Sequence, residues 1–357
     1  MPRARDLGIV IGAGRPGPNN AITDVAGVEV GYSTLIEGDG VRTGVTVIVP
    51  FGGREPLFAG THRLNGNGEM TGTHWIRESG MLTTPIAITN THSVGAVHQA
   101  LIARAVEEEP AATDSWSLPV VAETWDGFLN DINGFHVRPE HVFAAMDAAQ
   151  GGPIAGGNVG GGTGMICHGF KGGTGTSSRV LDEAAGGWTV GVLVQANHGS
   201  RARLQIEGVP VGRELDPDVI PLPRRGDSEQ GSIIVVVATD APLIPTQCER
   251  LAQRAGLGIG RTGGLGANSS GDLFLAFATG NRPVVLDGDP PPPVVSLQML
   301  QNSRITPLFE AVVEATEEAI VNALLAADTM TGYRGATAYR LDPDRLVEVM
   351  RQHRRLT

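Results

Sequence analysis

The chain has 357 residues, among them 50 Gly and 23 Pro, with 41% hydrophobic, 4% aromatic and 18% charged residues. Its formal net charge of −11 excludes the basic surface needed to bind a nucleic acid or an anionic membrane. Val, Ile, Leu and Ala are frequent enough to bury a sizeable core, so we expect a folded globular protein. By length alone, two domains are the first expectation.

The cysteines and histidines do not form a recognisable metal or disulfide pattern. Cys167 and Cys248 are isolated, and the nine His residues make no HxxxH or HExxH pair. No apolar run approaches the roughly 18 residues that span a bilayer, and the N-terminus has no apolar segment typical of a signal peptide. We therefore expect a cytoplasmic protein.

In the first half of the chain, short β-branched runs alternate with Gly, Pro and Asn turns. This pattern predicts strands and hairpins near the N-terminus, followed by alternating strands and helices. Pro110 and Gly151 mark the ends of the two helices. The expected strands are residues 28–30, 45–49, 85–89 and 118–125, and the expected helices are residues 92–109 and 139–150.

In the second half, a polar loop of residues 216–231 is followed at once by SIIVVVATD, residues 232–240. A strand this apolar is predicted to be buried on both faces, and the loop before it is the best candidate for a boundary or a processing site. The helix at residues 245–255 is expected to end at Gly256. The other expected elements are strands at residues 188–196 and 270–278, and helices at residues 306–327 and from about residue 342.

Residues 151–178 hold 12 of the glycines. Two interpretations are open, a phosphate-binding loop or a tight irregular segment packed beneath a site. Because Lys171 follows Phe170, the segment lacks the GxxxxGK[ST] pattern, and the second interpretation is favoured.

The bond between Gly231 and Ser232 carries the most suggestive chemistry. If it is cut, Ser232 becomes an N-terminal residue with a hydroxyl nucleophile and an α-amine of pKa roughly 7.7–8.0, which can accept the hydroxyl proton. Gly231 offers an unhindered carbonyl and tolerates the distortion of an N→O acyl shift. From pattern alone, however, the favoured interpretation is that this bond merely begins a strand.

Several long blocks carry a family resemblance, among them GSIIVVVATDAPLIPTQCERLAQRAGLGIGRTG, NSSGDLFLAF, ETWDGFLNDING, NVGGGTGMICHGFKGG and VGVLVQANHG. They resemble the DmpA-type self-processing aminopeptidases (peptidase family S58), which include L-aminopeptidase D-Ala-esterase/amidases and β-peptidyl aminopeptidases. In that family a precursor cuts itself before a Ser, and the matching bond here is Gly231–Ser232. The resemblance makes self-cleavage before Ser232 the favoured interpretation of this bond. It also implies one catalytic domain made of chains 1–231 and 232–357.

The same resemblance implies roles for three more residues. The family's second active-site Ser and its acidic partner match Ser270 and Asp272, which lie on the same face of a strand because they are two residues apart. Asn197 matches the Asn whose amide stabilises the oxyanion. Without the resemblance, turn or capping chemistry is the better interpretation of these residues.

Glu123 matches the family residue that binds the ammonium group of the substrate, which selects for a free amine. Trp125, expected on the same strand face, stands where some members have Tyr. Because Trp offers only an N–H donor, we expect it to form a pocket wall.

The resemblance also implies the fold and the reaction. The fold is an α/β (α+β) αββα sandwich of the DmpA and ornithine acetyltransferase type, related to N-terminal-nucleophile hydrolases. The reaction releases N-terminal residues from small peptides, amides and esters through an acyl-enzyme, without metal or organic cofactor, in a tetramer of αβ units.

Two alternatives stay open. An acyltransferase resembling ornithine acetyltransferase would have Thr as its nucleophile, and Ser232 argues against it. A non-enzymatic nucleotide- or ligand-binding protein would use the Gly-rich segment, and the missing Walker and Rossmann patterns argue against that.

Overall fold

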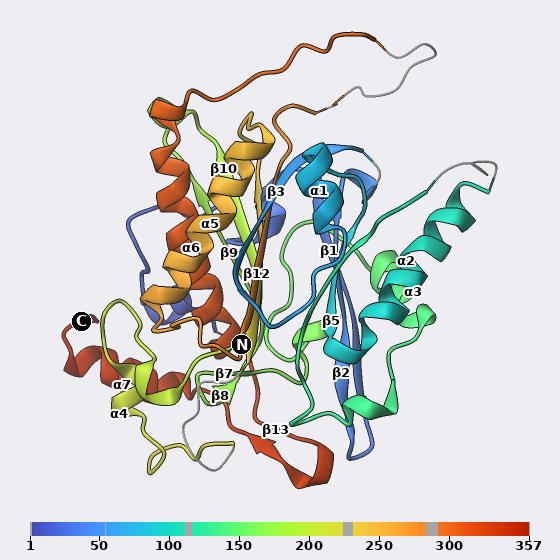
Figure 1. Cartoon of the computed structure of the whole chain (residues 1–357). Helices are drawn as coiled ribbons and strands as arrows, with labels where there is room; N and C mark the ends of the chain where they lie inside the picture. The colour runs from blue at the N-terminus through green and yellow to red at the C-terminus, as the bar shows by residue number, and fades with distance from the viewer. Residues whose placement is uncertain are drawn as a thin grey trace.

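Two β-sheets lie face to face in the middle of the molecule, and helices cover the outer face of each (Figure 1). The structure is a computed structural model that describes residues 2–53, 55–110, 116–223, 231–282, 284 and 292–356. Part of the predicted polar loop, residues 224–230, lies outside this range.

The larger sheet has six strands in the order β4-β3-β12-β11-β10-β9. β11 and β12 are parallel neighbours, and the other pairs are antiparallel. β11 and β12 therefore begin at the same end of the sheet, the end at which β10 finishes. The bounds are β3 Leu57–Gly66, β4 Met81–Leu82, β9 Gly173–Val180, β10 Thr189–Asn197, β11 Ser232–Thr239 and β12 Gly271–Ala278.

The smaller sheet has four strands in the order β1-β2-β5-β6. The predicted N-terminal hairpin is present as β1 and β2, and both strands are longer than expected. β5 and β6 are parallel neighbours, and helix α2 connects them. The bounds are β1 Val28–Glu37, β2 Val41–Pro50, β5 Ile86–Asn90, β6 Val120–Thr124 and α2 Val94–Glu108.

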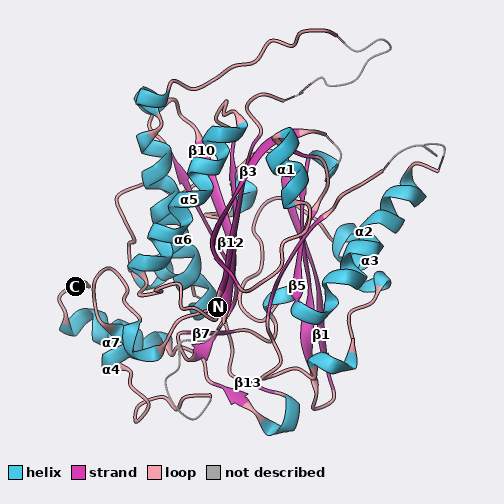
Figure 2. Ribbon diagram, in the orientation of Figure 1, coloured by secondary structure: helices cyan, strands magenta, loops and turns pink. Residues whose placement is uncertain are grey.

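Helices α5 and α6 cover the six-stranded sheet, and α2 and α3 cover the four-stranded sheet, as the cyan and magenta layers in Figure 2 show. In the described part of the chain, no helix is both long and apolar enough to cross a membrane. The remaining bounds are α1 Thr73–Ser79, α3 Pro139–Asp147, α4 Val211–Glu214, α5 Pro245–Arg261, α6 Thr306–Leu325, α7 Pro343–Gln352, β7 Ile166–Cys167, β8 Phe170–Lys171, β13 Met330–Thr331 and β14 Thr337–Ala338.

Strand β11 shows how the sequence builds these layers. Its odd-numbered residues from Ile233 to Val237 face the core beneath α5 and α6, and its even-numbered residues from Ile234 to Ala238 face the core between the sheets. A third core lies between the four-stranded sheet and the helices α2 and α3. The prediction that this strand is buried on both faces is confirmed.

One helix end differs from its expected place, and several elements were not predicted. The helix expected to end at Gly256 continues to Arg261, because its later glycines let α5 lie close to α6: a Cβ built on Gly258 would be 2.7 Å from the Cβ of Thr316. The elements without a prediction include β3, α1 and β9. The sequence of β9, GTGTSSRV, has the Gly, Ser and Thr typical of loops.

Candidate active site

Ser232 lies where three neighbouring strand ends meet. It is the first residue of β11 and pairs with Asn197, the last residue of β10. Its Oγ accepts a hydrogen bond of 2.9 Å from the backbone N–H of Gly271, the first residue of β12. Because its apolar run makes β11 a central, buried strand, the Ser232 hydroxyl is held in place by the buried backbone of the neighbouring strand.

Ser270 and Asp272 are in direct contact beside it. The Ser270 Oγ donates to Asp272 Oδ1 at 2.6 Å. The other carboxylate oxygen of Asp272 accepts from Asn65 Nδ2 at 3.2 Å, and the same amide donates to the carbonyl of Ala267 at 3.1 Å. Asn65, near the end of β3, was not predicted, because only the pairing of β3 with β12 brings it to the carboxylate.

Gly231 has a φ of +125°, a backbone conformation that disfavours any residue with a side chain. A Cβ built on it would lie 1.8 Å from the carbonyl oxygen of Asn197 and 3.5 Å from Asn197 Nδ2. The bond from Gly231 to Ser232 is therefore held in a conformation that requires glycine, next to the amide nitrogen of Asn197.

The Asn197 side chain is fixed at both ends. Its Oδ1 accepts from the backbone N–H of Ile166 at 2.8 Å, which identifies the nitrogen as Nδ2, and Nδ2 donates to the carbonyl of Trp125 at 2.9 Å. An amide nitrogen carries two N–H donors. One can therefore serve an oxyanion while the other stays on Trp125.

Glu123, in β6 of the other sheet, is a buried carboxylate. One oxygen accepts from the backbone N–H of Glu69 at 3.0 Å, and the other accepts from the Thr91 hydroxyl. Burial raises the pKa of Glu123 above its ordinary value, although these two hydrogen bonds oppose the shift. Neither partner was predicted, and Glu69 acts through its backbone, which leaves no side-chain signal in the sequence.

Gly68 lies between the Glu123 carboxylate and Gly271, the residue that contacts the Ser232 hydroxyl. A Cβ built on Gly68 would lie 3.1 Å from Glu123 Oε1 and 3.2 Å from the Cα of Gly271. Gly271 in turn contacts the Ser232 hydroxyl. The structure thus brings Glu123 to the same region as the residues of the six-stranded sheet.

Trp125 differs from its expected position. Strand β6 ends at Thr124, so the expectation that Trp125 shares a strand face with Glu123 is wrong. Its side chain is 40% exposed, and its backbone carbonyl is the group that holds Asn197. A role of the ring in the pocket wall stays a prediction.

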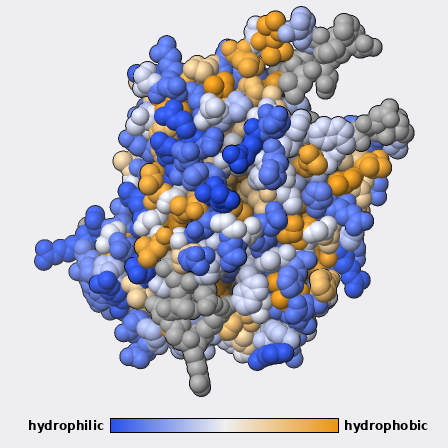
Figure 3. Space-filling view, in the orientation of Figure 1, coloured by the Kyte–Doolittle hydropathy of each residue, from blue (hydrophilic) through white to orange (hydrophobic). Residues whose placement is uncertain are grey.

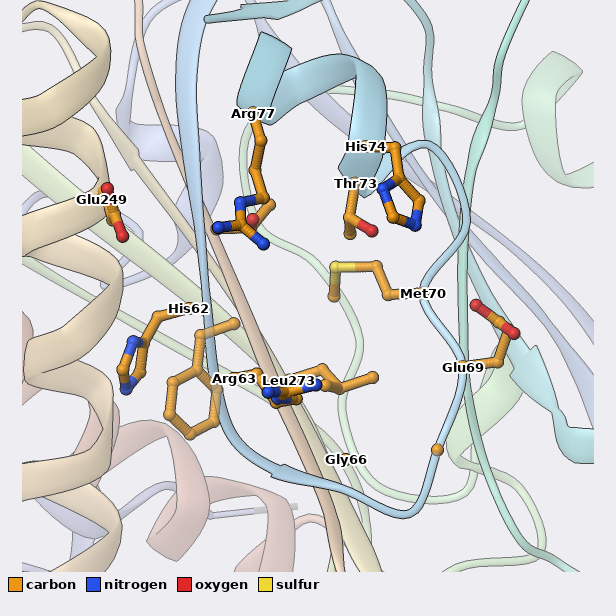
Figure 4. Close-up of a pocket in the computed structure, with 13 residues that line it drawn as sticks. His62, Arg63, Gly66, Glu69, Met70, Thr73, His74, Arg77, Glu249 and Leu273 are labelled. Atoms are coloured by element: carbon orange, nitrogen blue, oxygen red, sulfur yellow. The ribbon is translucent and has the colours of Figure 1, made fainter.

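A pocket of about 390 Å³ opens beside this region, between β3, α1, α5 and β12 (Figure 4). Gly68 and Glu69, which adjoin the Glu123 carboxylate, belong to its wall. Figure 4 shows Arg77 extending from α1 toward Met70 and His62. The pocket also includes Arg63, His74 and Glu249. It therefore presents both signs of charge next to the site.

The Gly-rich segment packs against the site. Its residue Ile166 holds Asn197, and the buried Lys171 Nζ donates to the carbonyl of Gly172 at 2.8 Å. Burial lowers the pKa of Lys171 to about 7. The only lysine of the chain is therefore buried and donates to the backbone of this segment.

One buried group has the composition of a metal site. Cys167, His168 and His198 bring one potential ligand atom each to within 4.8 Å of one another. Burial raises the pKa of the Cys167 thiol to about 12. Cys167 contacts His198, with 3.8 Å between Sγ and Nδ1.

Comparisons with known proteins show what this chain is similar to over almost its full length. The β-peptidyl aminopeptidase BapA of Sphingosinicella microcystinivorans is 51% identical over 376 residues, which cover 99% of this chain and 93% of that protein. A solved Burkholderia sp. β-aminopeptidase is 56% identical with a TM-score of 0.91 and covers 98% of this chain and 99% of its own.

The solved L-aminopeptidase D-Ala-esterase/amidase of Ochrobactrum anthropi, described as a prototype for the serine aminopeptidases and a new variant among the Ntn hydrolase fold, is 46% identical. Its TM-score is 0.91, and the match covers 100% of both chains. These similarities confirm the αββα fold and the hydrolase class expected from the sequence, and they give no support to the acyltransferase and nucleotide-binding alternatives. Peptidase family S58 matches residues 20–338. The chain therefore belongs to peptidase family S58.

Proposed function

We propose that this chain is a single catalytic domain that cuts itself between Gly231 and Ser232 and then acts as an aminopeptidase. The observation that carries the proposal is the Ser232 hydroxyl, held at 2.9 Å by the Gly271 N–H, directly after a glycine in a conformation that requires glycine. The products are chains of residues 1–231 and 232–357, whose strands share one sheet.

After the cut, Ser232 carries both the nucleophile and its base. Its Oγ attacks the carbonyl of the N-terminal residue of the substrate, and its α-amine takes up the hydroxyl proton. The Asn197 amide, oriented by Ile166, stabilises the oxyanion. The α-amine then protonates the leaving amine, and water hydrolyses the acyl-enzyme.

The neighbouring residues complete the proposed site. Ser270 and Asp272 form a hydrogen-bonded pair beside the nucleophile. This pair orients the Ser232 hydroxyl and stabilises the protonated amine. Glu123 binds the ammonium group of the substrate and thereby selects for a free N-terminus. No step requires a metal or an organic cofactor.

The substrates we propose are small peptides, amides and esters with a free amine. The names of the two β-aminopeptidase relatives favour an N-terminal β-residue, whereas the name of the Ochrobactrum enzyme favours L- and D-residues. A panel of p-nitroanilides and amides of L-Ala, D-Ala, Gly and β-homo-amino acids separates these preferences.

We further propose a homotetramer of αβ units in the cytoplasm. Residues 294–299 include the exposed apolar side chains of Val294, Val295, Leu297 and Met299, and Figure 3 shows orange residues at the corresponding upper edge of the molecule. Such exposed apolar surface supports self-association. The two unbridged, buried cysteines suit a reducing compartment.

Denaturing mass spectrometry of the purified protein tests the self-cleavage. Two chains, 1–231 and 232–357, are expected for the parent, and one chain for Ser232→Ala. Amine labelling adds a check, because Lys171 is the only lysine and the 232–357 chain has one amine, at its new N-terminus. An intact parent chain that is nevertheless active overturns the mechanism.

A further inference from the structure

Asp126 carries a buried carboxyl group to which the mechanism above gives no role. The residue directly follows Trp125, whose carbonyl holds Asn197. It is 1% exposed, and it forms no ion pair with any residue that the structure describes. Burial raises the pKa of Asp126 to about 7. Burying a carboxyl group without a cation costs free energy, so its polar neighbours must hold it in this position.

Asn130 holds the Asp126 side chain and the turn that follows β6. Its Nδ2 donates to Asp126 Oδ1 at 3.1 Å, and the backbone N–H groups of Leu129 and Asn130 both donate to the Asp126 carbonyl at 3.0 Å. Asn130 Oδ1 in turn accepts from the backbone N–H of Arg42, in β2, at 3.0 Å. Asp126 is therefore held through its side chain and through its backbone.

The peptide bond between Trp125 and Asp126 carries the carbonyl that orients Asn197. Asn197 Nδ2 donates to this oxygen at 2.9 Å. Because the carbonyl lies in the same rigid peptide plane as the Asp126 N–H, its direction depends on where Asp126 is held. Gly164 packs closely against this residue, since a Cβ built on Gly164 would be 2.8 Å from the Asp126 Cβ. A displacement of Asp126 therefore moves the acceptor that orients the oxyanion donor.

Thr43 and Asn90 border the Asp126 carboxyl group from β2 and β5. Their contacts with it favour its ionised form and oppose the effect of burial on its pKa. These contacts do not give Oδ2 a full hydrogen bond, because this oxygen has no partner of hydrogen-bond geometry among the described residues. Asn90 Nδ2 donates to Thr43 Oγ1 at 2.7 Å, and both side chains are buried. The carboxyl group, the hydroxyl and the amide thus form one buried polar cluster.

Asn90 connects this cluster to the carboxylate of Glu123. Its Oδ1 accepts from the backbone N–H of Ser93 at 3.0 Å and so caps the short 3-10 helix Thr91–Ser93. Thr91 is the first residue of that helix, and its hydroxyl donates to Glu123. The position of Asn90 therefore determines where the hydroxyl that orients Glu123 lies.

We propose that Asp126 is a positioning residue for both ends of the substrate site. At one end it holds the Trp125 carbonyl that orients Asn197. At the other end it acts through Asn90 on the hydrogen bond between Thr91 and Glu123. The inference rests on the proposed function, because Asp126 itself does not touch the substrate and works only through the two groups that do.

The test compares kcat and KM on a p-nitroanilide with a free amine, both referred to the amount of processed 232–357 chain. Asp126→Ala is expected to lower kcat/KM by roughly 100-fold, because a small misplacement of the groups around a reacting bond costs about that much. The loss should appear in kcat through Asn197 and in KM through Glu123. Asp126→Asn keeps an acceptor for Asn130 Nδ2 and is expected to restore most of this loss.

A second variant keeps the proposal testable if Asp126→Ala does not fold. Thr43→Val removes one buried hydroxyl and keeps the shape of the side chain, so it interrupts only the contact with Asn90. KM is expected to rise about tenfold, the effect of one hydrogen bond, with a smaller change in kcat. Thr239→Val is the matched control. Its hydroxyl is also buried, donates to the Thr189 carbonyl and lies at the end of β11 opposite Ser232, so both constants should match the parent.

Three results overturn the proposal. One is a folded Asp126→Ala protein with the kcat and KM of the parent, since a merely structural residue would lower the melting temperature and leave both constants unchanged. Another is an Asp126→Asn protein as impaired as Asp126→Ala, because the charge would then matter rather than the position. The third is a Thr43→Val protein that matches Thr239→Val. A parent that neither cuts itself nor hydrolyses the p-nitroanilide refutes the proposed function instead, which distinguishes the two failures.

Discussion

The backbone of Gly231 lies so close to Asn197 that a Cβ on Gly231 would be 1.8 Å from the Asn197 carbonyl oxygen. Both residues take part in the proposed self-cleavage, because the Asn197 side-chain amide lies beside the bond after Gly231 that we propose is cut. A single contact thus restricts both the identity of the residue before the cut and the position of the oxyanion donor.

Gly231→Ala is expected to slow self-cleavage by roughly 100-fold or more, because the Cβ forces the bond away from Asn197 and a positive φ disfavours alanine. Mass spectrometry of freshly made protein measures the fraction cut. Gly260→Ala is the control, because a Cβ there meets nothing within 4 Å. Equal cleavage of both variants contradicts the importance of this contact.

Asn65→Ala is expected to lower kcat of the processed enzyme about tenfold, with little change in KM, because Asp272 loses a hydrogen bond that orients it toward Ser270. Steady-state kinetics on a p-nitroanilide measures both constants. Asn281→Ala is the control, since that amide also donates two hydrogen bonds, to the backbone carbonyls of Leu243 and Gln298, away from the site. An effect on KM alone would instead assign Asn65 to substrate binding.

Glu123→Gln is expected to reduce kcat/KM for substrates with a free amine by about 100-fold while leaving self-cleavage intact, because the precursor has no free amine at that position. Burial raises the pKa of Glu123, and only the ionised carboxylate binds an ammonium group. The kcat/KM of the parent should therefore fall as the pH drops through a value above the ordinary 4.5. The variant should lack this second fall in kcat/KM and keep the one at higher pH that belongs to the Ser232 α-amine.

Glu140→Gln, on the exposed surface of α3, is the control for the loss of one charge. It should keep the rate of the parent and both falls in kcat/KM. If Glu123→Gln blocks self-cleavage in a folded protein, the assigned role in ammonium binding is refuted.

The sequence was most informative where a local pattern determines structure. The β-branched run after Gly231 predicts a buried strand because both faces must be apolar. The two-residue spacing of Ser270 and Asp272 predicts that their side chains point to the same side, and they do so in the structure, although β12 begins only at Gly271 and Ser270 precedes it. Both features depend on neighbours along the chain, and both are present.

The contacts that orient the site depend on sheet order, which no local pattern specifies. Asn65 reaches Asp272 only because β3 pairs with β12, and Glu69 holds Glu123 through a backbone N–H that any residue would supply. The contact between Cys167 and His198 likewise joins residues far apart in the chain. These relationships required the three-dimensional structure.

Lys171 provides a test of stability that is independent of catalysis. Burial lowers its pKa to about 7 in the folded protein from 10.5, so between these values the unfolded chain binds a proton that the folded chain does not. The free energy of unfolding should therefore gain a contribution that rises with pH across this window, at up to about 1.4 kcal/mol per pH unit, and is constant below and above it. Urea unfolding of the single-chain Ser232→Ala protein between pH 6 and 10 measures it.

Lys171→Met in the same background is expected to lack this rise, because methionine does not titrate. Lys171→Arg should be less stable than its parent across the range and should not recover at high pH, because the guanidinium stays charged where the structure buries it. The difference in the free energy of unfolding between Lys171→Arg and its parent should grow as the pH increases, since only the lysine becomes neutral. Parallel curves for all three proteins would mean that Lys171 keeps the same protonation in the folded and unfolded states.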